Sequence, residues 1–232
     1  MAILYSAAYG SAKVYRVDTA AKTIENAFVA DCDIRGIACD LDGYVHCYDG
    51  DTVVKVHDPS DGSLIKTVTH ADLNHSGTNG YAVDHEGYLW PGGYSGSQSK
   101  NDPVTGAKIL SWNNGLSDTD PRAWTLDNYL AIAVHYDIYK CVPATGAYSL
   151  YVSTSIYMHD GGFDFDARDE TIWCCRKDAK TYYQVSVATG QTIQSVTPTP
   201  IGGLGSNPTV DILAHRDRFY TPPEESGWVC LT

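Results

Sequence analysis

The chain has 232 residues, of which 43% are hydrophobic and 19% are charged, and this balance excludes intrinsic disorder and is typical of one folded domain. Its formal net charge of −12 argues against nucleic acid and anionic lipid as partners, because both bind mainly through Lys and Arg. No apolar run is long enough to span a bilayer, and the first residues lack the features of a signal peptide. We therefore expect no nucleic-acid binding, no membrane insertion and synthesis in the cytoplasm, and the final location is left open.

The first predicted elements are strands over residues 3–6, 13–17 and 23–29, and the last two are joined by a turn that begins at Asp18. Comparable strand–turn–strand segments recur along the chain, and their turns begin at Asp58, Asp102, Val142 and Ser186. Successive turns are therefore 40, 44, 40 and 44 residues apart. A period of this length and regularity is typical of the blades of a β-propeller.

A second pattern recurs between these turns: an apolar strand, a short acidic or glycine-containing turn, and an aromatic strand. Residues 36–45 and 81–90 show it best, and weaker copies lie at 123–130, 163–173 and 212–220. The pattern predicts a β-hairpin. Each repeat then has four strands, which we name a, b, c and d in chain order. The sequence therefore predicts an all-β fold, a single β-propeller domain over residues 1–232.

The turns and hairpins resemble those of the YVTN, NHL and quinoprotein-like β-propeller superfamily. Members of that superfamily carry a V-D-x-x-T-G turn and an S-P-D-G-x-x-Y-V hairpin, to which residues 138–146 and 36–45 are similar. The resemblance covers nearly the whole chain. It implies a propeller of four-stranded blades and says almost nothing about function, because this fold serves many activities.

The number of blades depends on how the two ends of the chain meet. With five blades, an a strand over residues 210–214 completes the N-terminal blade, and the last hairpin packs outside. With six, the first blade lacks its innermost strand and the last lacks its outermost strand. We favour about five blades, because a missing inner strand would leave a hole along the axis. A third alternative is that unpaired edges at both ends join a second copy into a homo-oligomer.

The cysteines offer no metal site. There is no C-x-x-C pair and no zinc-finger spacing, so we expect small, buried apolar side chains. The seven are Cys32, Cys39, Cys47, Cys141, Cys174, Cys175 and Cys230.

Other candidates for chemistry are few. His75, Asp120 and His159 fall in connections from a strand d to the next strand a, and such loops face one mouth of the central channel. We retain these three as candidate ligand-binding residues. The Asp-x-Asp pairs of the sequence occur mostly at turns, where Asp is expected, and neither a nucleophile elbow nor a P-loop is present. The sequence predicts no catalytic residue, no metal and no cofactor.

Tyrosines recur in the b–c loops and form the most suggestive pattern. Tyr9, Tyr48 and Tyr94 occur at similar positions in the first three repeats, Tyr136 occurs in the fourth, and Asp49 follows Tyr48. Aromatic rings can stack on sugars while carboxylates bind hydroxyl groups, and repeated sites would add avidity. The alternative is that these tyrosines are wedges that pack between blades.

Three functions remain open. The first is a non-enzymatic structural, assembly or recognition module with protein partners, such as an accessory structural protein of a virion or of another large complex. The second is a carbohydrate-binding, lectin-like propeller that binds glycans. The third is a small propeller glycosidase or lyase. The aromatic loops, the free edges and the lack of a recognisable catalytic set favour the first.

Overall fold

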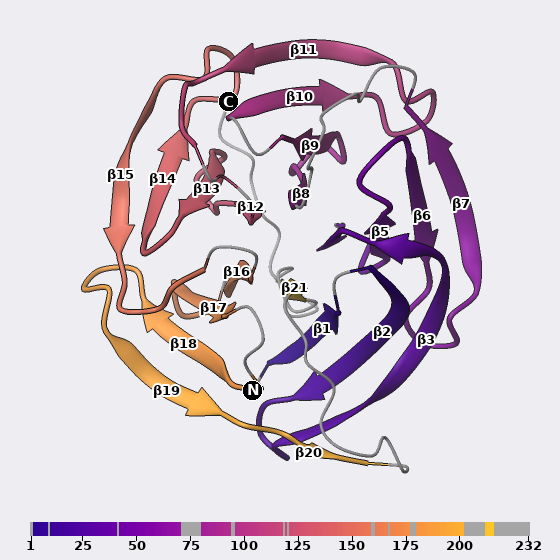
Figure 1. Ribbon diagram of the computed structural model, residues 1–232, viewed down its shortest axis with the longest axis vertical. Coiled ribbons are helices and arrows are strands. Elements are labelled where there is room, and N and C mark those ends of the chain that lie inside the picture. Colours follow the sequence, from indigo (N-terminus) through magenta and orange to yellow (C-terminus); the bar gives the residue numbers. More distant parts are fainter. Residues whose placement is uncertain are drawn as a thin grey trace, which may run out of the picture.

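The computed structural model describes residues 2–8, 10–40, 42–70, 80–93, 96–117, 119, 121–158, 161–166, 168–176 and 180–201, and the backbone of 212–215. These residues form five sheets around a central axis, as predicted for a five-bladed β-propeller (Figure 1). The five-bladed alternative is confirmed and the six-bladed one is wrong. No helix among the described residues is long and apolar enough to cross a membrane.

Each blade has four antiparallel strands, which follow one another from the axis outward as a, b, c and d. Blade 1 contains β21 (Ile212–His215), β1 (Ile3–Ala7), β2 (Ser11–Asp18) and β3 (Thr23–Ile34). Blade 2 contains β4 (Gly36–Cys39), β5 (Val45–Tyr48), β6 (Val53–His57) and β7 (Leu64–Thr69). Blade 3 contains β8 (Gly80–Val83), β9 (Leu89–Gly92), β10 (Ser97–Asn101) and β11 (Lys108–Asn113).

The last two blades follow the same plan. Blade 4 contains β12 (Arg122–Trp124), β13 (Leu130–Val134), β14 (Asp137–Cys141) and β15 (Tyr148–Ser153). Blade 5 contains β16 (Gly162–Asp166), β17 (Thr171–Cys175), β18 (Tyr182–Ser186) and β19 (Thr192–Val196). The short β20 (Thr199–Pro200) follows blade 5 and lies beside β3 (Figure 1).

Burial decreases from the axis to the rim within each blade. The inner strands β8 and β16 are buried at every position, because neighbouring blades cover both faces of their sheets. The outer strands β7 and β19 have one buried residue each. This gradient explains the sequence pattern, since continuous apolar runs mark the strands near the axis and mixed polar runs mark the rim.

Blade 1 closes the ring with strands from both ends of the described chain. Strand β21 pairs antiparallel with β1, so that residue 215 lies opposite Leu4, and this is the closure predicted for five blades. Strand β20 also pairs, in parallel, with the start of β3. The Thr199 N–H donates to the Lys22 carbonyl at 2.8 Å, and the Ile201 N–H donates to the Ile24 carbonyl at 2.8 Å. The sequence did not predict this outer clasp, and the predicted last hairpin lies outside the described residues.

The c–d turns overlap the preceding blade, and this overlap explains their glycines. Gly146 has a φ of 73°, and a Cβ at this position would lie 2.6 Å from the Trp112 ring at the end of β11. The equivalent glycines of the other repeats are Gly62, Gly106 and Gly190. Blade 1 departs from the pattern because Lys22, with a φ of 56°, stands at this position.

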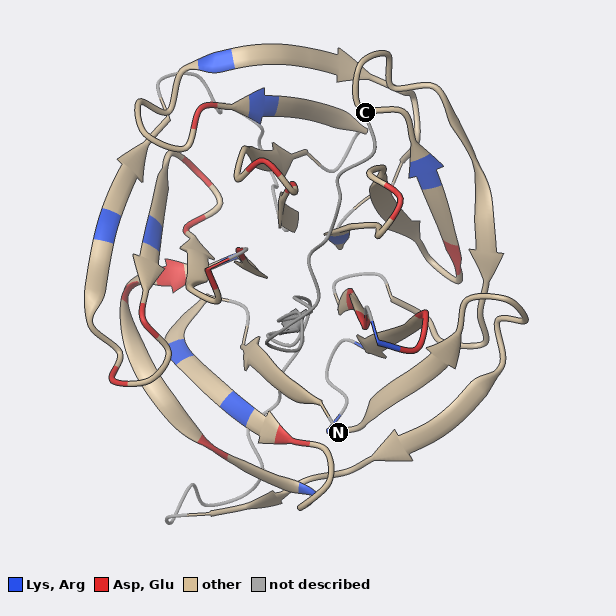
Figure 2. Ribbon diagram, turned by 180° about the vertical axis from the view of Figure 1, so that it is seen from behind, with Lys and Arg blue, Asp and Glu red and all other residues tan. Residues whose placement is uncertain are grey.

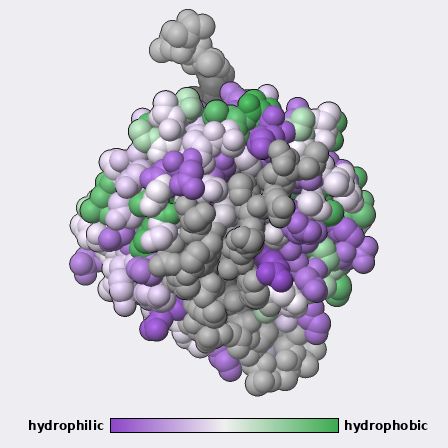
Figure 3. Space-filling view, turned by 45° about the horizontal axis from the view of Figure 1, so that its top comes forward, coloured by the Kyte–Doolittle hydropathy of each residue, from purple (hydrophilic) through white to green (hydrophobic). Residues whose placement is uncertain are grey.

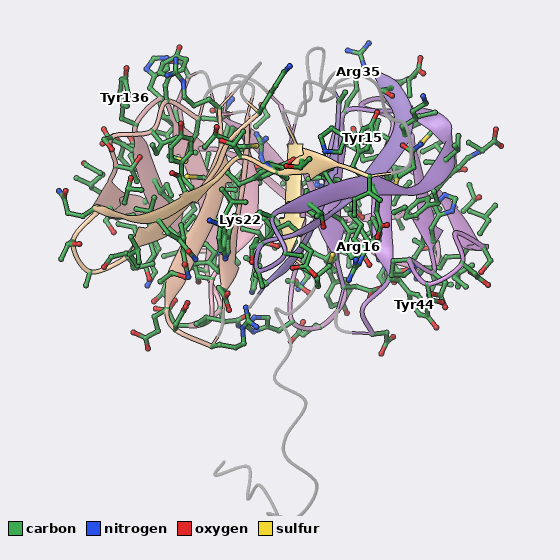
Figure 4. The ribbon with its side chains drawn as sticks, turned by 90° about the horizontal axis from the view of Figure 1, so that it is seen from below. Tyr15, Arg16, Lys22, Arg35, Tyr44 and Tyr136 are labelled. Carbon is green, nitrogen blue, oxygen red and sulfur yellow. The ribbon has the colours of Figure 1, made fainter. Side chains whose placement is uncertain are left out.

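The propeller has two distinct faces. Tyr136, in a b–c turn, and Arg35, in a d–a connection, extend toward one face, whereas Tyr44, in an a–b turn, extends toward the other (Figure 4). Acidic residues mark the a–b turns around the axis on the Tyr44 face (Figure 2).

Candidate functional site

The acidic a–b turns are held together by their own carboxylates. In blade 2, Asp40 Oδ1 accepts the N–H groups of Asp42 and Tyr44 at 3.1 and 2.9 Å. Its Oδ2 lies 2.8 Å from Nε2 of the buried His46. Burial alone would raise the pKa of the Asp40 carboxyl, but the hydrogen bonds from His46 and the backbone lower it below its ordinary value. Asp40 therefore stabilises the turn.

Blade 3 repeats this arrangement with an indole in place of the imidazole. Asp84 Oδ1 accepts the N–H groups of Glu86 and Tyr88 at 3.0 and 2.8 Å. Its Oδ2 accepts the N–H of Trp90 Nε1 at 2.9 Å, and Lys100 Nζ lies 3.3 Å away. The inner hairpins of blades 2 and 3 thus share one carboxylate anchor.

Asp49, a predicted ligand-binding residue, has a similar local role. Its Oδ1 accepts backbone N–H groups from Asp51, Thr52 and Val53 at 2.9, 3.1 and 3.0 Å. These three bonds shape the b–c loop of blade 2, as expected for Asp at a turn.

The two described tyrosines of the b–c pattern differ in their surroundings. Tyr48 is fully buried, its ring stacks on that of Tyr81 at 5.5 Å between centroids, and its hydroxyl donates to the Asp51 carbonyl at 3.3 Å. Tyr48 is therefore a wedge between blades 2 and 3. Tyr136 is 50% exposed and makes an edge contact with Tyr157 at 5.3 Å. The remaining predicted site residues, Tyr9, His75, Tyr94, Asp120 and His159, lie outside the described residues.

The described cysteines are free thiols, and five of these six are buried. Burial raises the pKa of Cys141 to about 12 and that of Cys32 to about 11, so both thiols stay protonated near neutral pH. In the described part of the chain, no group of three or more His, Cys, Asp or Glu side chains is placed to hold a metal ion.

Exposed hydrophobic side chains concentrate on blade 4. Of the twelve large exposed hydrophobic residues among the described ones, five belong to this blade, while every other blade has at most two. Hydrophobic residues occur in separate patches around the rim (Figure 3). The five are Leu126, Tyr136, Val142, Tyr148 and Leu150, and we call the last three the blade 4 rim.

A groove of about 340 Å³ lies beside the blade 4 rim. Lys140 crosses it, with its Nζ paired to the Asp127 carboxylate and 4.1 Å from the centre of the Tyr151 ring. The charges of Lys140 and Asp127 therefore cancel, and the groove has no net charge. Its lining consists of Asp127, Tyr129, Lys140, Val142, Ala147, Tyr148 and Ser149.

The outer strand of blade 4 has an unprotected edge. Among the described residues β15 pairs only with β14, and its sequence YSLYVS contains no charge. Edge strands of soluble proteins usually carry charges or proline that discourage pairing, and β7 and β11 carry Lys66 and Lys108, whereas β19 (TIQSV) is uncharged like β15. The sequence analysis did not predict this uncharged edge, although the uncharged run over residues 148–153, after Gly146, is visible in the sequence.

The comparisons with known proteins show the fold alone. No family model and no curated protein matches the chain. The chain is similar to a chain in the crystal structure of a nidogen/laminin complex, with a TM-score of 0.64 and 11% identity over 94% of this chain and 99% of that one. It is also similar to a protein of unknown function from Bacteroides caccae, with a TM-score of 0.50 and 11% identity over 84% and 72% of the two chains. These likenesses support the β-propeller and leave the predicted superfamily as a resemblance.

Proposed function

We propose that this protein is a non-enzymatic interaction module that binds a protein partner through the blade 4 rim, as part of a larger assembly such as a virion. β-Propellers are often protein-interaction modules. The observation that carries the proposal is the concentration of exposed hydrophobic side chains on a blade whose outer edge also lacks charge.

The chemistry of the rim indicates what the partner supplies. Tyr148 and Leu150 are 46% and 56% exposed on an edge strand with unpaired backbone groups. An extended partner segment can add to such an edge through main-chain hydrogen bonds, while adjacent pockets accept its side chains. The neutral groove lined by Tyr129 and Tyr148 suits an apolar or aromatic side chain. We therefore expect a partner strand with alternating hydrophobic residues.

The non-enzymatic part of the proposal rests on the carboxylates. Asp40, Asp49 and Asp84 each accept two or more hydrogen bonds from their own turns. Groups engaged in this way serve local structure. A glycosidase would require two carboxylates facing each other across a cleft, whereas Asp166 and Asp169 of blade 5, which line one pocket, are bound by Arg168 and Gln184 of their own blade.

Site-specific photo-crosslinking in the native source tests the proposal. A benzoylphenylalanine in place of Leu150 is expected to crosslink to one partner chain, identified by mass spectrometry. The same group in place of Ile65, which is 47% exposed on the rim of blade 2, is the matched control and is expected to remain uncrosslinked. Recovery of a second copy of this chain would identify the assembly as a homo-oligomer.

A charge at the same position gives a second measurement. Leu150→Lys is expected to weaken binding to the crosslinked partner by about tenfold or more, whereas Ile65→Lys leaves it unchanged. A protein that stays monomeric in its source and forms no crosslink from position 150 would overturn the proposal.

A further inference from the structure

A polar pocket of about 240 Å³ opens where blade 5 meets blade 1, on the face of the a–b turns. The two blades, orange and indigo, meet near the N-terminus (Figure 1). The volume greatly exceeds the ~10–15 Å³ that admits one water molecule and lies below the ~300–1,000 Å³ of pockets for drug-sized ligands. Its lining consists of Ala2, Thr19, Asp166, Arg168, Asp169, Trp173, Gln184 and Gln194.

The pocket contains a buried donor without an acceptor. Trp173 is 1% exposed, and its indole Nε1 has no hydrogen-bond partner in the described part of the chain. An unpaired buried donor is costly, so native structures rarely retain one without a reason.

Blade 3 shows what this donor lacks. Trp173 pairs with Asp164, two residues before Asp166, just as Trp90 pairs with Ala82, two residues before Asp84. In blade 3 the indole donates to that Asp.

In blade 5 an arginine binds the corresponding carboxylate. Arg168 Nε lies 2.8 Å from Asp166 Oδ1, and its Nη2 lies 2.6 Å from Oδ2. The Trp173 N–H is therefore left without a carboxylate partner in the described part of the chain, and Trp173 is one of the residues that line the pocket.

The polar walls of the pocket are fixed in orientation. The Gln184 carbonyl oxygen accepts from Gln194 Nε2 at 2.6 Å, while Gln184 Nε2 donates to Asp169 Oδ2 at 2.9 Å. On the blade 1 side of the pocket, Thr19 Oγ1 donates to the Ala2 carbonyl at 2.9 Å. Gln184 and Thr19 are both 7% exposed. Groups already held in place bind a ligand at a lower cost in conformational entropy.

The donor and acceptor pattern selects a class of ligand. Two carboxylates, Asp166 and Asp169, disfavour an anion, and the Arg168 charge is already paired with Asp166. An ammonium group has no lone pair to accept the Trp173 N–H. A hydroxyl group satisfies both requirements, because it accepts one hydrogen bond and donates another.

We propose that this pocket binds one neutral, hydroxyl-rich unit, a sugar residue or a polyol. One ligand hydroxyl accepts the N–H of Trp173 Nε1 and donates to a carboxylate of the pocket. Gln194, at the exposed margin, offers its amide to a second hydroxyl. The site is independent of the blade 4 rim.

Indole NMR tests the proposal directly. The chain has five tryptophans, so ¹⁵N-labelled protein gives few indole N–H signals, and Trp173→Phe assigns the relevant one. We would titrate free monosaccharides, myo-inositol and glycerol, and probe a glycan array in parallel. A saturable shift of the Trp173 signal is the expected result. Binding to the array alone identifies a glycan-linked sugar as the ligand, and binding to free compounds alone identifies a soluble polyol.

Three variants distinguish binding at this pocket from a general effect on the protein. Trp173→Phe is expected to lower affinity by about tenfold, the equivalent of one hydrogen bond of about 1.4 kcal/mol. Trp90→Phe, which removes the indole at the same strand position of blade 3, leaves affinity unchanged. Asp169→Asn, at an exposed position, weakens binding, because it removes a carboxylate of the pocket and one of the acceptor oxygens that hold Gln184 and Thr171.

The proposal is overturned if neither the free compounds nor a glycan that binds on the array shifts the Trp173 signal, if the shift does not saturate, or if Trp173→Phe binds as the wild type does. Any of these results leaves the blade 4 crosslinking experiment unaffected, so the two proposals fail separately.

Discussion

The junctions between blades 3 and 4 and between blades 5 and 1 are both built around a tryptophan at the same strand position. In the first, Trp90 lies 5.3 Å from Trp124 and 6.4 Å from Trp112 between ring centroids. The Trp90 N–H is bound by Asp84, and Trp112 Nε1 donates to the Pro143 carbonyl at 2.9 Å. Both of these indole N–H groups are thus satisfied within the fold.

The closing junction has the same tryptophan with different neighbours. Trp173 packs with Leu4, Val17 and Ile24 from blade 1, but its N–H has no partner among the described residues and a pocket lies beside it. The c–d turn there uses Lys22 instead of glycine, and β20 is clasped to β3.

The difference shows that the repeat places a tryptophan at the same strand position in blades 3 and 5, but does not give both tryptophans the same hydrogen-bond partner. Junction 3/4 joins consecutive blades, so the overlapping turn, its glycine and the tryptophans lie within one continuous stretch of chain. Junction 5/1 joins opposite ends of the chain, where the local repeat is interrupted. A polar pocket lies at this junction, where the carboxylate equivalent to Asp84 is bound by Arg168 of the same blade.

The largest expected effect comes from removing the close approach at junction 3/4. Gly146→Ala combines strain at a φ of 73° with a Cβ 2.6 Å from the Trp112 ring, and we expect a loss of about 2–4 kcal/mol in the free energy of unfolding. Gly115→Ala is the matched control, because its φ is 75° and no atom lies within 4 Å of the added Cβ. The control should lose only about 1 kcal/mol. Urea unfolding followed by circular dichroism measures both, and equal losses would show that the Trp112 contact is unimportant.

An intermediate effect on the free energy of unfolding is expected when each of the two tryptophans is replaced by phenylalanine. Trp90→Phe and Trp173→Phe remove similar apolar area, but only the first breaks a hydrogen bond to a buried carboxylate. Trp90→Phe should therefore be less stable than Trp173→Phe by about 1–3 kcal/mol. The comparison requires denaturant melts of both variants under one condition. If Trp173→Phe is the less stable, its N–H has a partner that the comparison with blade 3 fails to identify.

The smallest effect on stability is expected at Lys22, a turn residue whose carbonyl accepts a hydrogen bond from β20. Lys22→Gly relieves a left-handed conformation at an exposed residue, and its gain is reduced by the greater freedom of glycine in the unfolded chain. We expect a net stabilisation of about 0.5 kcal/mol, seen as a small rise in the midpoint of thermal unfolding. A clear fall in the midpoint would show that the Lys22 side chain itself supports the closure.

Much of the fold could be predicted because its signals are local. The turns at Asp58 and Asp102 need only Asp, Pro and Gly at fixed offsets, and the hairpins need only apolar strands around a tight turn. The same locality explains why the Asp40/Asp42 and Asp49/Asp51 pairs lie at turns as predicted, since Asp49 accepts hydrogen bonds from three residues that follow it within its own loop. Asp164 and Asp166 instead lie in strand β16.

The tyrosine pattern marks where local reasoning stops. Tyr48 is the last residue of β5 and Tyr136 lies in the turn after β13, and the first is a buried wedge whereas the second is half exposed. Their burial depends on the neighbouring blade, which supplies Tyr81 to cover the first and leaves the second open. The spacing within the repeat places Tyr48 four residues after Tyr44 and Tyr136 seven residues after Tyr129, but only packing between blades decides that Tyr81 covers Tyr48.

The sequence by itself determined the strands, the turns and the repeat, because backbone preferences and hairpin chemistry act over a few residues. Only the tertiary structure decided that β21 and β20 close the ring on blade 1, that β15 presents an uncharged edge, and that Trp173 lacks the acceptor available to Trp90. The closure of the ring and the edge position of β15 depend on which surfaces meet when distant parts of the chain are brought together. The acceptor of Trp173 is lost within blade 5, because the side chain of Arg168 binds Asp166.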